Sequence, residues 1–321
     1  MRHRPVGGPA GPATSAICLG ALPFGTTVDQ ETSFAILDRF TEAGGTFIDT
    51  ANNYSFWIDG ATGDESETML GRWFAARGNR DDVVLASKVG GRPRQPGLGL
   101  EATEGLSDKA IRTAIDASLS RLGTDRIDLY YAHVEDRSVP VEETAGAFAQ
   151  VVADGKAGVL GCSNHPTWRI ERARQVARAH SWPAYTCVQQ RYSYLRPRPG
   201  ARLPEGGHVH ATDELLDYVR SEPDLSLMAY TSLLFGAYTR PERLPEHYEH
   251  PGTTARRAVL AEVARELGVT PIQVVLAWLI GGDPAITPIV GVSSVAQLDE
   301  CLGAADLELP AELRHRLDAP A

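Results

Sequence analysis

The sequence has few cysteines, no long apolar run and no excess of positive charge. Four cysteines are scattered without a Cys-x-x-Cys pair, which argues against a disulfide framework or a zinc ribbon: Cys18, Cys162, Cys187 and Cys301. No apolar run reaches the roughly 18 residues of a membrane span, since the longest, 272–280, contains Gln273. Residues 1–13 lack the apolar core of a signal peptide. The net charge of -10 would repel the phosphates of a nucleic acid. We therefore expect a cytoplasmic protein with reduced thiols that binds neither nucleic acid nor membrane.

What is present is the composition of a globular protein. The 321 residues are 43% apolar and 22% charged, which argues against general disorder. At about 150 residues per domain, a chain of this length would form two domains. A single α/β barrel domain, however, is routinely longer than 150 residues. We expect a single domain over residues 1–321.

Short β-branched runs alternate with longer amphipathic segments along the whole chain. The predicted strands are 16–19, 46–49, 83–87, 127–133, 159–162, 186–189, 225–230 and 285–290. The predicted helices are 30–43, 65–77, 107–122, 140–154, 166–179, 212–220 and 295–302. This alternation predicts parallel strands with crossover helices, and eight such units favour a closed (β/α)₈ TIM-type barrel. The alternative is an open doubly wound sheet, which would need a Gly-x-Gly-x-x-Gly turn to bind a dinucleotide. The residues after the first strand, 20–23, do not provide it.

Four long segments do not fit short connections: 55–64, 90–104, 195–210 and 238–253. All four follow strands, so in a barrel they lie at the C-terminal face, where sites are built. The alternative is that these segments are disordered surface loops without a role in a site. Residues 1–15 precede the first strand, and Gly7-Gly8 predicts a tight hairpin that plugs the N-terminal end of the barrel.

Four polar residues fall at or just beyond the ends of successive strands: Asp49, Tyr54, Lys88 and His133. Each alone is weak evidence, because a strand-end lysine is often a solvated charge and a lone histidine is often an interior one. Together they have a chemical logic. An ammonium lowers the pKa of a tyrosine hydroxyl from about 10, and an aspartate holds the lysine in place. A neutral histidine can donate a hydrogen bond to a carbonyl oxygen.

Such a group would polarise a carbonyl and protonate the developing alkoxide, which is worth roughly 10²- to 10⁴-fold in rate. None of the four side chains is a reductant, so a hydride donor must come from a cofactor.

The segments 47–54, 87–88 and 128–133 resemble the aldo-keto reductase superfamily. The resemblance continues through 19–25, 161–164, 188–189, 230–233 and 288–291, in order along nearly the whole chain. It implies a (β/α)₈ barrel that reduces aldehydes or ketones with a nicotinamide cofactor, usually NADPH. The family's catalytic tetrad corresponds to Asp49, Tyr54, Lys88 and His133.

The resemblance also implies cofactor contacts. Ser163, Asn164 and Gln189 match the residues that hold the nicotinamide carboxamide, and Tyr230 matches the stacking ring. The pyrophosphate loop corresponds to Thr231, Leu233 and Gly236, and the adenosine end to Gly291, Ser293, Gln297 and Glu300. Thr231 replaces a frequent serine and keeps the hydroxyl. The stretch 291–297 has no lysine or arginine, so a 2′-phosphate would lose a charge-assisted contact there. We expect NADPH, with NADH use open unless an arginine from elsewhere reaches this site.

The sequence indicates the residues of the substrate pocket less clearly. Its candidates are aromatic residues: Phe24, Phe56, Trp57, Tyr192 and Tyr194. Three of these five are equally consistent with packing under loops. The loop arginines 92, 94, 196 and 198 would suit an anionic substrate or a solvated surface.

Two other functions remain as alternatives. Potassium-channel β subunits resemble the same family, and such a regulatory protein would bind cofactor and turn over slowly. A metal-dependent hydrolase is disfavoured, because no His-x-His pair follows the first strand, and we expect no metal. A small-molecule carbonyl compound is the expected partner. The physiological substrate, the direction of reaction and the oligomeric state stay open.

Overall fold

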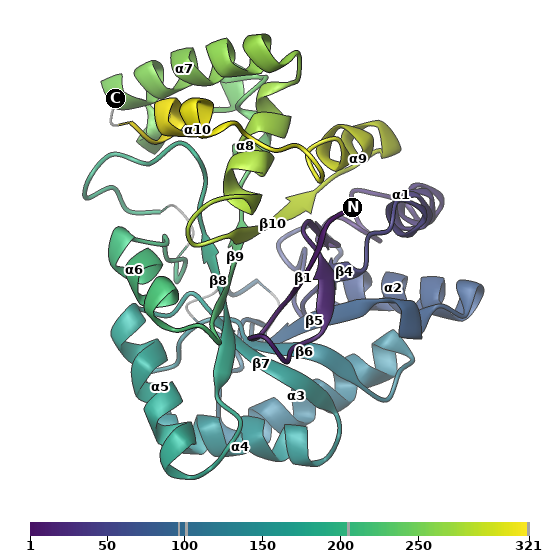
Figure 1. The fold of residues 1–321 in the computed structure, drawn as a ribbon. Coiled ribbons are helices and arrows are strands. Elements are labelled where there is room, and N and C mark those ends of the chain that lie inside the picture. The colour runs from purple at the N-terminus through teal and green to yellow at the C-terminus, as the bar shows by residue number, and fades with distance from the viewer. Residues whose placement is uncertain (96, 100–101, 204–205, 320–321) are drawn as a thin grey trace.

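Eight parallel strands close into a barrel at the centre of the molecule (Figure 1). The computed structural model describes residues 1–95, 97–99, 102–203 and 206–319. In chain order the barrel strands are β3 (Cys18–Gly20), β4 (Phe47–Asp49), β5 (Val84–Val89), β6 (Ile127–Ala132), β7 (Ala157–Ser163), β8 (Tyr185–Arg191), β9 (Ser226–Tyr230) and β10 (Ile286–Gly291). Each strand pairs in parallel with the next, and β10 pairs with β3 to close the ring. The predicted TIM-type barrel is confirmed.

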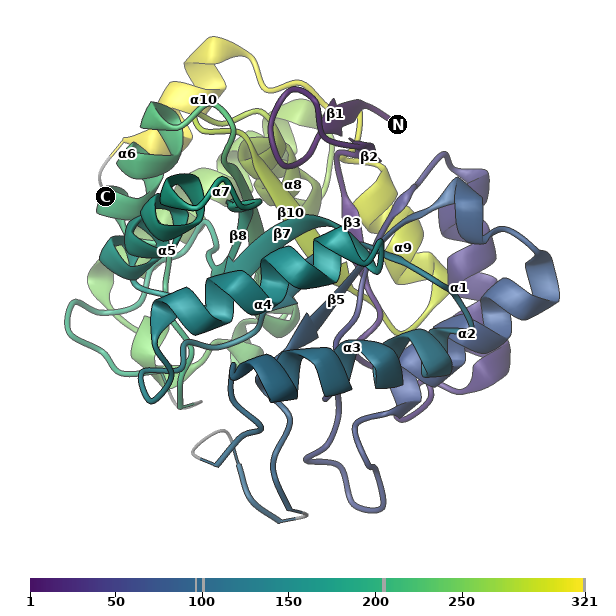
Figure 2. The same ribbon diagram turned by 90° about the horizontal axis from the view of Figure 1, so that it is seen from below.

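Helices cover the outside of the barrel (Figure 2). They are α1 (Gln30–Glu42), α2 (Glu65–Arg77), α3 (Asp108–Leu122), α4 (Val141–Ala153), α5 (Thr167–Ala179), α6 (Asp213–Ser221), α7 (Pro251–Leu267), α8 (Pro271–Ile280), α9 (Val295–Leu302) and α10 (Ala311–Asp318). Their ends follow from the sequence: at α3, the Ser107 side chain accepts from the Ala110 N–H, and Gly123 ends the helix in the left-handed conformation.

Three of these helices, α7, α8 and α10, were not predicted from the sequence. The segment 238–253, expected to be a loop, contains two 3₁₀ turns, Pro241–Arg243 and Glu246–Tyr248, and the first turn of α7. Helix α8 contains the apolar run 272–280 and is buried on nearly every side, so it shows little helical periodicity. No single helix in the described part of the chain is long and apolar enough to cross a bilayer, although the pair α7–α8, bent by 96°, passes that test when taken together.

The N-terminal segment forms the expected hairpin. Strands β1 (His3–Pro5) and β2 (Ala13–Ser15) are antiparallel, and Val6, only 1% exposed, packs among residues of the barrel interior such as Phe47 and Leu129. The plug is therefore confirmed, but the turn is not tight. Residues 6–12 form it, and the Val6 N–H donates to the Pro12 carbonyl at 3.0 Å.

The strand register places the candidate site at one rim of the barrel. Asp49, the last residue of β4, pairs with Gly20 of β3 and with Ala86 of β5. On the opposite side of the ring, Ser163 at the end of β7 pairs with Gln189 of β8. Because all strands run the same way, residues at their C-terminal ends converge on one face.

Candidate active site

The Lys88 ammonium is the centre of a buried polar cluster. Its Nζ donates to Asp49 Oδ2 at 2.6 Å, to the Thr50 carbonyl at 2.7 Å and to the Tyr54 hydroxyl at 2.6 Å. An ammonium has three protons, so these three acceptors use all of them. Lys88 is 0% exposed and Asp49 is 1% exposed. Lys88 therefore has a single fixed geometry, determined by β4, β5 and the loop after β4.

Tyr54 and His133 complete the predicted tetrad. The Tyr54 hydroxyl donates to Asp49 Oδ2 at 2.7 Å, so the phenol lies between the carboxylate and the ammonium. The rings of Tyr54 and His133 meet edge to face, with centroids 6.1 Å apart at 76°. His133 follows β6 directly, and its backbone N–H donates to the Val89 carbonyl at the end of β5. The four residues named from strand ends thus meet at one place, and both rings are half-buried.

Burial sets the protonation states of these groups. Burial first, and then the nearby Asp49 carboxylate, raise the pKa of Tyr54 well above its ordinary value. Burial lowers the pKa of Lys88, and Asp49 opposes this shift. Burial and the Lys88 charge lower the pKa of His133 well below its ordinary value. At neutral pH Tyr54 is therefore a phenol and His133 a neutral imidazole. The pKa shift of Tyr54 is therefore upward, opposite to the lowering expected from a neighbouring ammonium alone.

Gln189 and Asn164 lie in the same network. Gln189 donates from Nε2 to Asp49 Oδ1 at 2.8 Å, so it holds the second carboxylate oxygen. Asn164 has a left-handed backbone, and its Nδ2 donates to the His133 carbonyl and to Ser163 Oγ, both at 3.0 Å. Asn164 Oδ1 accepts from the Tyr230 hydroxyl at 2.7 Å. Three of the residues predicted to contact a nicotinamide are therefore already bound to one another.

Three further residues shape this site and were not assigned to it from the sequence. Gln190 Oε1 accepts from the Asn164 N–H at 2.7 Å and so holds the left-handed turn. His208 lies 5.5 Å from the Tyr230 ring at 73°. Gly91 lies against His133, because a Cβ on Gly91 would be 2.8 Å from His133 Nδ1. The only sequence signal was adjacency: Gln190 follows Gln189, and Gly91 lies three residues after Lys88.

The segment 231–236 is a tightly turned loop after β9. Thr231, Leu234, Phe235 and Gly236 all have positive φ, and the Leu234 and Gly236 N–H groups donate to carbonyls within the loop. Phe235 is 59% exposed. Leu233 and Gly236 both lie in this loop, and their predicted contact with a pyrophosphate stays a prediction.

At the predicted adenosine end, helix α9 begins after β10. Gly291 ends β10, and a Cβ there would meet nothing within 4 Å, so the rim is open. The Ser293 N–H and hydroxyl donate to Gln297 Oε1 at 2.8 and 3.1 Å, so these two predicted contacts bind each other. Glu300 is half-buried further along α9. One arginine from another element does reach this helix: Arg39 of α1 donates to Asp299 at 2.7 Å.

The aromatic candidates for the substrate pocket divide into two groups. Phe24, Tyr192 and Tyr194 are at most 3% exposed, and both tyrosines pack on Trp278 of α8. All three lie in the hydrophobic core between the barrel and the helices, so in this structure they present almost no surface to a ligand. Phe56 and Trp57 form an edge-to-face pair with centroids 5.1 Å apart, and Trp57 is 59% exposed. These two remain available to a ligand.

The loop arginines bind parts of the protein rather than facing the site unpaired. Arg92 donates to Asp64 Oδ1 at 2.5 Å and to the Asn52 carbonyl at 2.7 Å, which ties the loop after β5 to the loop after β4. Arg196 donates to the Tyr192 hydroxyl at 2.9 Å. Residues 96, 100–101 and 204–205 of these loops lie outside the described residues. Within the described part of the chain, no cluster of His, Cys, Asp and Glu side chains could hold a metal ion.

Comparison with known proteins agrees with this geometry. The model of the Aldo/keto reductase family matches residues 16–320. The chain belongs to this family. It is 34% identical to norsolorinic acid reductase stcV of Emericella nidulans, over 97% of this chain and 79% of that protein. It is 32% identical to the uncharacterized oxidoreductase YrpG of Bacillus subtilis, over 97% and 93% of the two chains. It is 30% identical to an aryl-alcohol dehydrogenase [NADP(+)] of Phanerodontia chrysosporium, over 97% and 83%. The aldo-keto reductase is therefore an NAD(P)H-dependent oxidoreductase.

Proposed function

We propose that this aldo-keto reductase reduces a small-molecule aldehyde or ketone, with Tyr54 as the general acid. The observation that supports this most directly is the position of the Tyr54 hydroxyl. It lies 2.6 Å from the Lys88 ammonium and 2.7 Å from Asp49, beside a neutral His133. This is an arrangement for giving up a proton next to a fixed positive charge.

Each residue of the tetrad has a defined part in the reaction. The substrate carbonyl oxygen binds next to the Tyr54 hydroxyl and accepts a hydrogen bond from His133, which is neutral because burial lowers its pKa. When bound, the nicotinamide cofactor supplies a hydride from its C4. Tyr54 then gives its proton to the oxygen as negative charge develops there. The Lys88 ammonium stabilises the resulting phenolate, and Asp49 keeps that ammonium in place.

We propose NADPH as the preferred cofactor, with NADH also accepted. The left-handed segment 234–236 supports binding of the pyrophosphate, and the open rim at Gly291 supports the adenosine. Ser163, Asn164 and Gln189 would hold the carboxamide and Tyr230 would stack on the nicotinamide. Asn164 makes bonds to His133, Ser163 and Tyr230, so it would bind by exchanging one of them. The stretch 291–297 lacks a cation, and Arg39 is paired with Asp299, which favours a modest NADPH preference.

We propose aromatic aldehydes and aryl ketones as the substrate class. Phe56 and Trp57 stay near the surface on the loop after β4, beside Tyr54. The names of the relatives, norsolorinic acid reductase and aryl-alcohol dehydrogenase, also point to aromatic compounds. We further propose that the whole chain acts as one catalytic unit in the cytoplasm, where its four buried free thiols would stay reduced.

Titration with NADPH and then NADH, followed by quenching of the five tryptophans, tests the cofactor proposal. The same samples are then assayed with aromatic aldehydes, aryl ketones, dicarbonyls and ketoses. Micromolar binding together with turnover of aromatic carbonyls is the expected result. Tight cofactor binding without turnover of any carbonyl would instead favour a regulatory cofactor-binding protein. Failure to bind either nucleotide would contradict both functions.

A further inference from the structure

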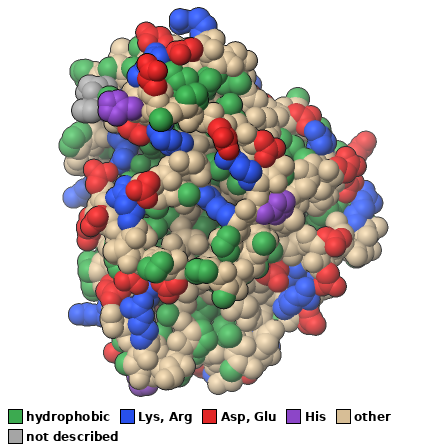
Figure 3. All heavy atoms as spheres, viewed as in Figure 1, with side chains coloured by type: hydrophobic (Ala, Val, Ile, Leu, Met, Phe, Trp, Pro, Cys, Tyr) green, Lys and Arg blue, Asp and Glu red, His purple; other side chains and the backbone are tan. Residues whose placement is uncertain are grey.

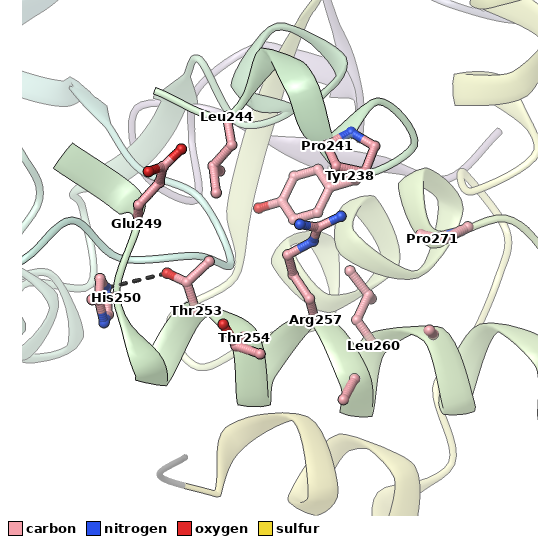
Figure 4. Close-up of a pocket in the computed structure, with 12 residues that line it drawn as sticks. Tyr238, Pro241, Leu244, Glu249, His250, Thr253, Thr254, Arg257, Leu260 and Pro271 are labelled. Carbon is pink, nitrogen blue, oxygen red and sulfur yellow. Dashed lines mark hydrogen bonds between the residues drawn. The ribbon is translucent and has the colours of Figure 1, made fainter. Parts of the chain in front are cut away.

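A pocket lies apart from the tetrad, between helix α7 and the segment that leads into it (Figure 4). It has a volume of about 500 Å³, within the range of small-molecule sites. Tyr238, Pro241 and Leu244 line it on one side, and Arg257 and Leu260 of α7 on the other. None of its described lining residues belongs to the tetrad or to the predicted cofactor contacts.

Arg257 is the unusual residue of this pocket. It is half-buried, yet its guanidinium makes no hydrogen bond or ion pair with any described residue. Among the arginines of the described ranges it is the only half-buried one of which this is true. Its neighbour Arg256, also half-buried, donates to the Tyr194 carbonyl at 3.3 Å and lies over the Tyr194 ring. Figure 4 shows the Arg257 side chain rising from α7 toward Tyr238 and Pro241.

Partial burial of a guanidinium removes part of its hydration, a cost that a carboxylate normally offsets. The flat guanidinium fork matches a carboxylate in a two-point contact. Glu249 also lines the pocket, but it forms no ion pair with Arg257. In Figure 4, Glu249 lies on the opposite side of the pocket from Arg257. The site for an anion beside Arg257 is therefore not filled by a described side chain of the protein.

The other residues that line the pocket indicate what kind of molecule would carry this anionic group. Pro241, Leu244, Leu260 and the Tyr238 ring form the apolar part of the lining, and His250, Thr253 and Thr254 add polar groups. The Tyr238 hydroxyl accepts the Leu195 N–H at 3.2 Å, which holds this ring in the wall. Glu249 at the far side would repel a second negative group. A highly charged ligand such as a nucleotide is disfavoured by this combination.

We propose that this pocket binds a small organic monocarboxylate with an apolar, ring-shaped body, and that its carboxylate pairs with Arg257. The ring packs on the apolar part of the lining around Pro241 and Leu244. Because the pocket shares no lining residue with the tetrad, the proposal stands or falls independently of the proposed reaction.

Calorimetric titration of the full chain with three probes tests it: 2-naphthoate, the neutral 2-naphthylmethanol and inorganic phosphate. The variants are Arg257→Gln and, as a matched control, Arg265→Gln, which changes an exposed arginine on the same helix. Arg257→Gln removes the charge-assisted hydrogen bond to the carboxylate, so it should weaken naphthoate binding about tenfold or more. Arg265→Gln should leave it unchanged, and neither variant should alter the binding of the neutral probe. Thermal unfolding of both variants confirms that they fold.

Three outcomes would overturn the proposal. One is the absence of naphthoate binding to the wild-type protein at millimolar concentration. Another is equal naphthoate affinity in the wild type and Arg257→Gln, which would place the probe at some other site. The third is phosphate binding as tightly as naphthoate with the same dependence on Arg257, which would make this a simple anion site without use of the apolar walls.

Discussion

The Nζ of Lys88 lies 2.6 Å from the Tyr54 hydroxyl and equally 2.6 Å from Asp49 Oδ2. The ammonium thus bridges the proposed proton donor and the carboxylate that fixes it. Both side chains of the Lys88–Asp49 pair are almost fully buried. Each buried charge is therefore stable only because the other one compensates it. This relation links stability to catalysis and gives the first prediction.

Lys88→Met should destabilise the fold by about 3 kcal/mol or more, because it leaves the Asp49 carboxylate buried without its cation. The double variant Lys88→Met/Asp49→Asn should recover much of that loss, since the buried charge is gone. Both variants should have very low turnover, because neither has an ammonium to stabilise the Tyr54 phenolate. Urea unfolding and steady-state kinetics measure the two effects. A double variant no more stable than the single one would contradict the account of this buried pair.

Gly91→Ala should lower kcat. The backbone of Gly91 is not left-handed, but a Cβ there would lie 2.8 Å from His133 Nδ1 and 2.9 Å from Asn53 Nδ2. The imidazole must then shift, and a displacement of about 1 Å can cost up to about a hundredfold in rate. Gly206→Ala is the control, because a Cβ there meets no atom of the described residues within 4 Å. Equal kcat values for the two variants would show that the His133 position does not depend on Gly91.

Acid should destabilise the protein through His165. Burial lowers the pKa of this imidazole from 6.5 to about 4. The unfolded chain therefore takes up a proton below pH 6.5 that the native protein takes up only near pH 4. His165 thus costs no stability above pH 6.5, and stability is lost at about 1.4 kcal/mol per pH unit between 6.5 and 4. His165→Asn should flatten the pH dependence of urea unfolding by about this slope, whereas His315→Gln, on the exposed face of α10, should not.

Ser293→Arg should raise the preference for NADPH over NADH about tenfold. Ser293 is exposed at the start of α9, where the stretch 291–297 has no cation, and an arginine would add a charge-assisted contact to a 2′-phosphate. Ser293→Gln serves as the control, because it adds a long side chain without charge. Dissociation constants from fluorescence quenching give the two ratios. An unchanged ratio in Ser293→Arg would mean that the adenosine does not bind at this helix.

The sequence was sufficient to predict the barrel and the tetrad, because alternating strands and helices fix where strand ends lie. Asp49, Lys88 and His133 needed only the register of β4 to β6 to be placed together. Helix α8 was not predicted because, apart from Gln273, it is apolar around its circumference and therefore shows no periodic pattern.

The other differences depend on packing, which no local pattern records. Phe24, Tyr192 and Tyr194 have the composition of pocket walls but lie in the core, since burial is set by distant elements such as α8. Gly91 affects His133 only through a contact across two loops. The direction of the Tyr54 pKa shift likewise depends on how deeply the hydroxyl is buried, and the residue order does not specify that depth.

Tyr54 is the proposed proton donor. The most direct measurement compares Tyr54→Phe with the wild type in single-turnover reduction of an aromatic aldehyde by bound NADPH, together with the NADPH dissociation constant. Loss of the hydroxyl should slow the reduction by roughly 10²- to 10⁴-fold. The dissociation constant should change less than about threefold, because no predicted cofactor contact is removed. Reduction of the aldehyde by Tyr54→Phe at close to the wild-type rate would show that Tyr54 is not the proton donor.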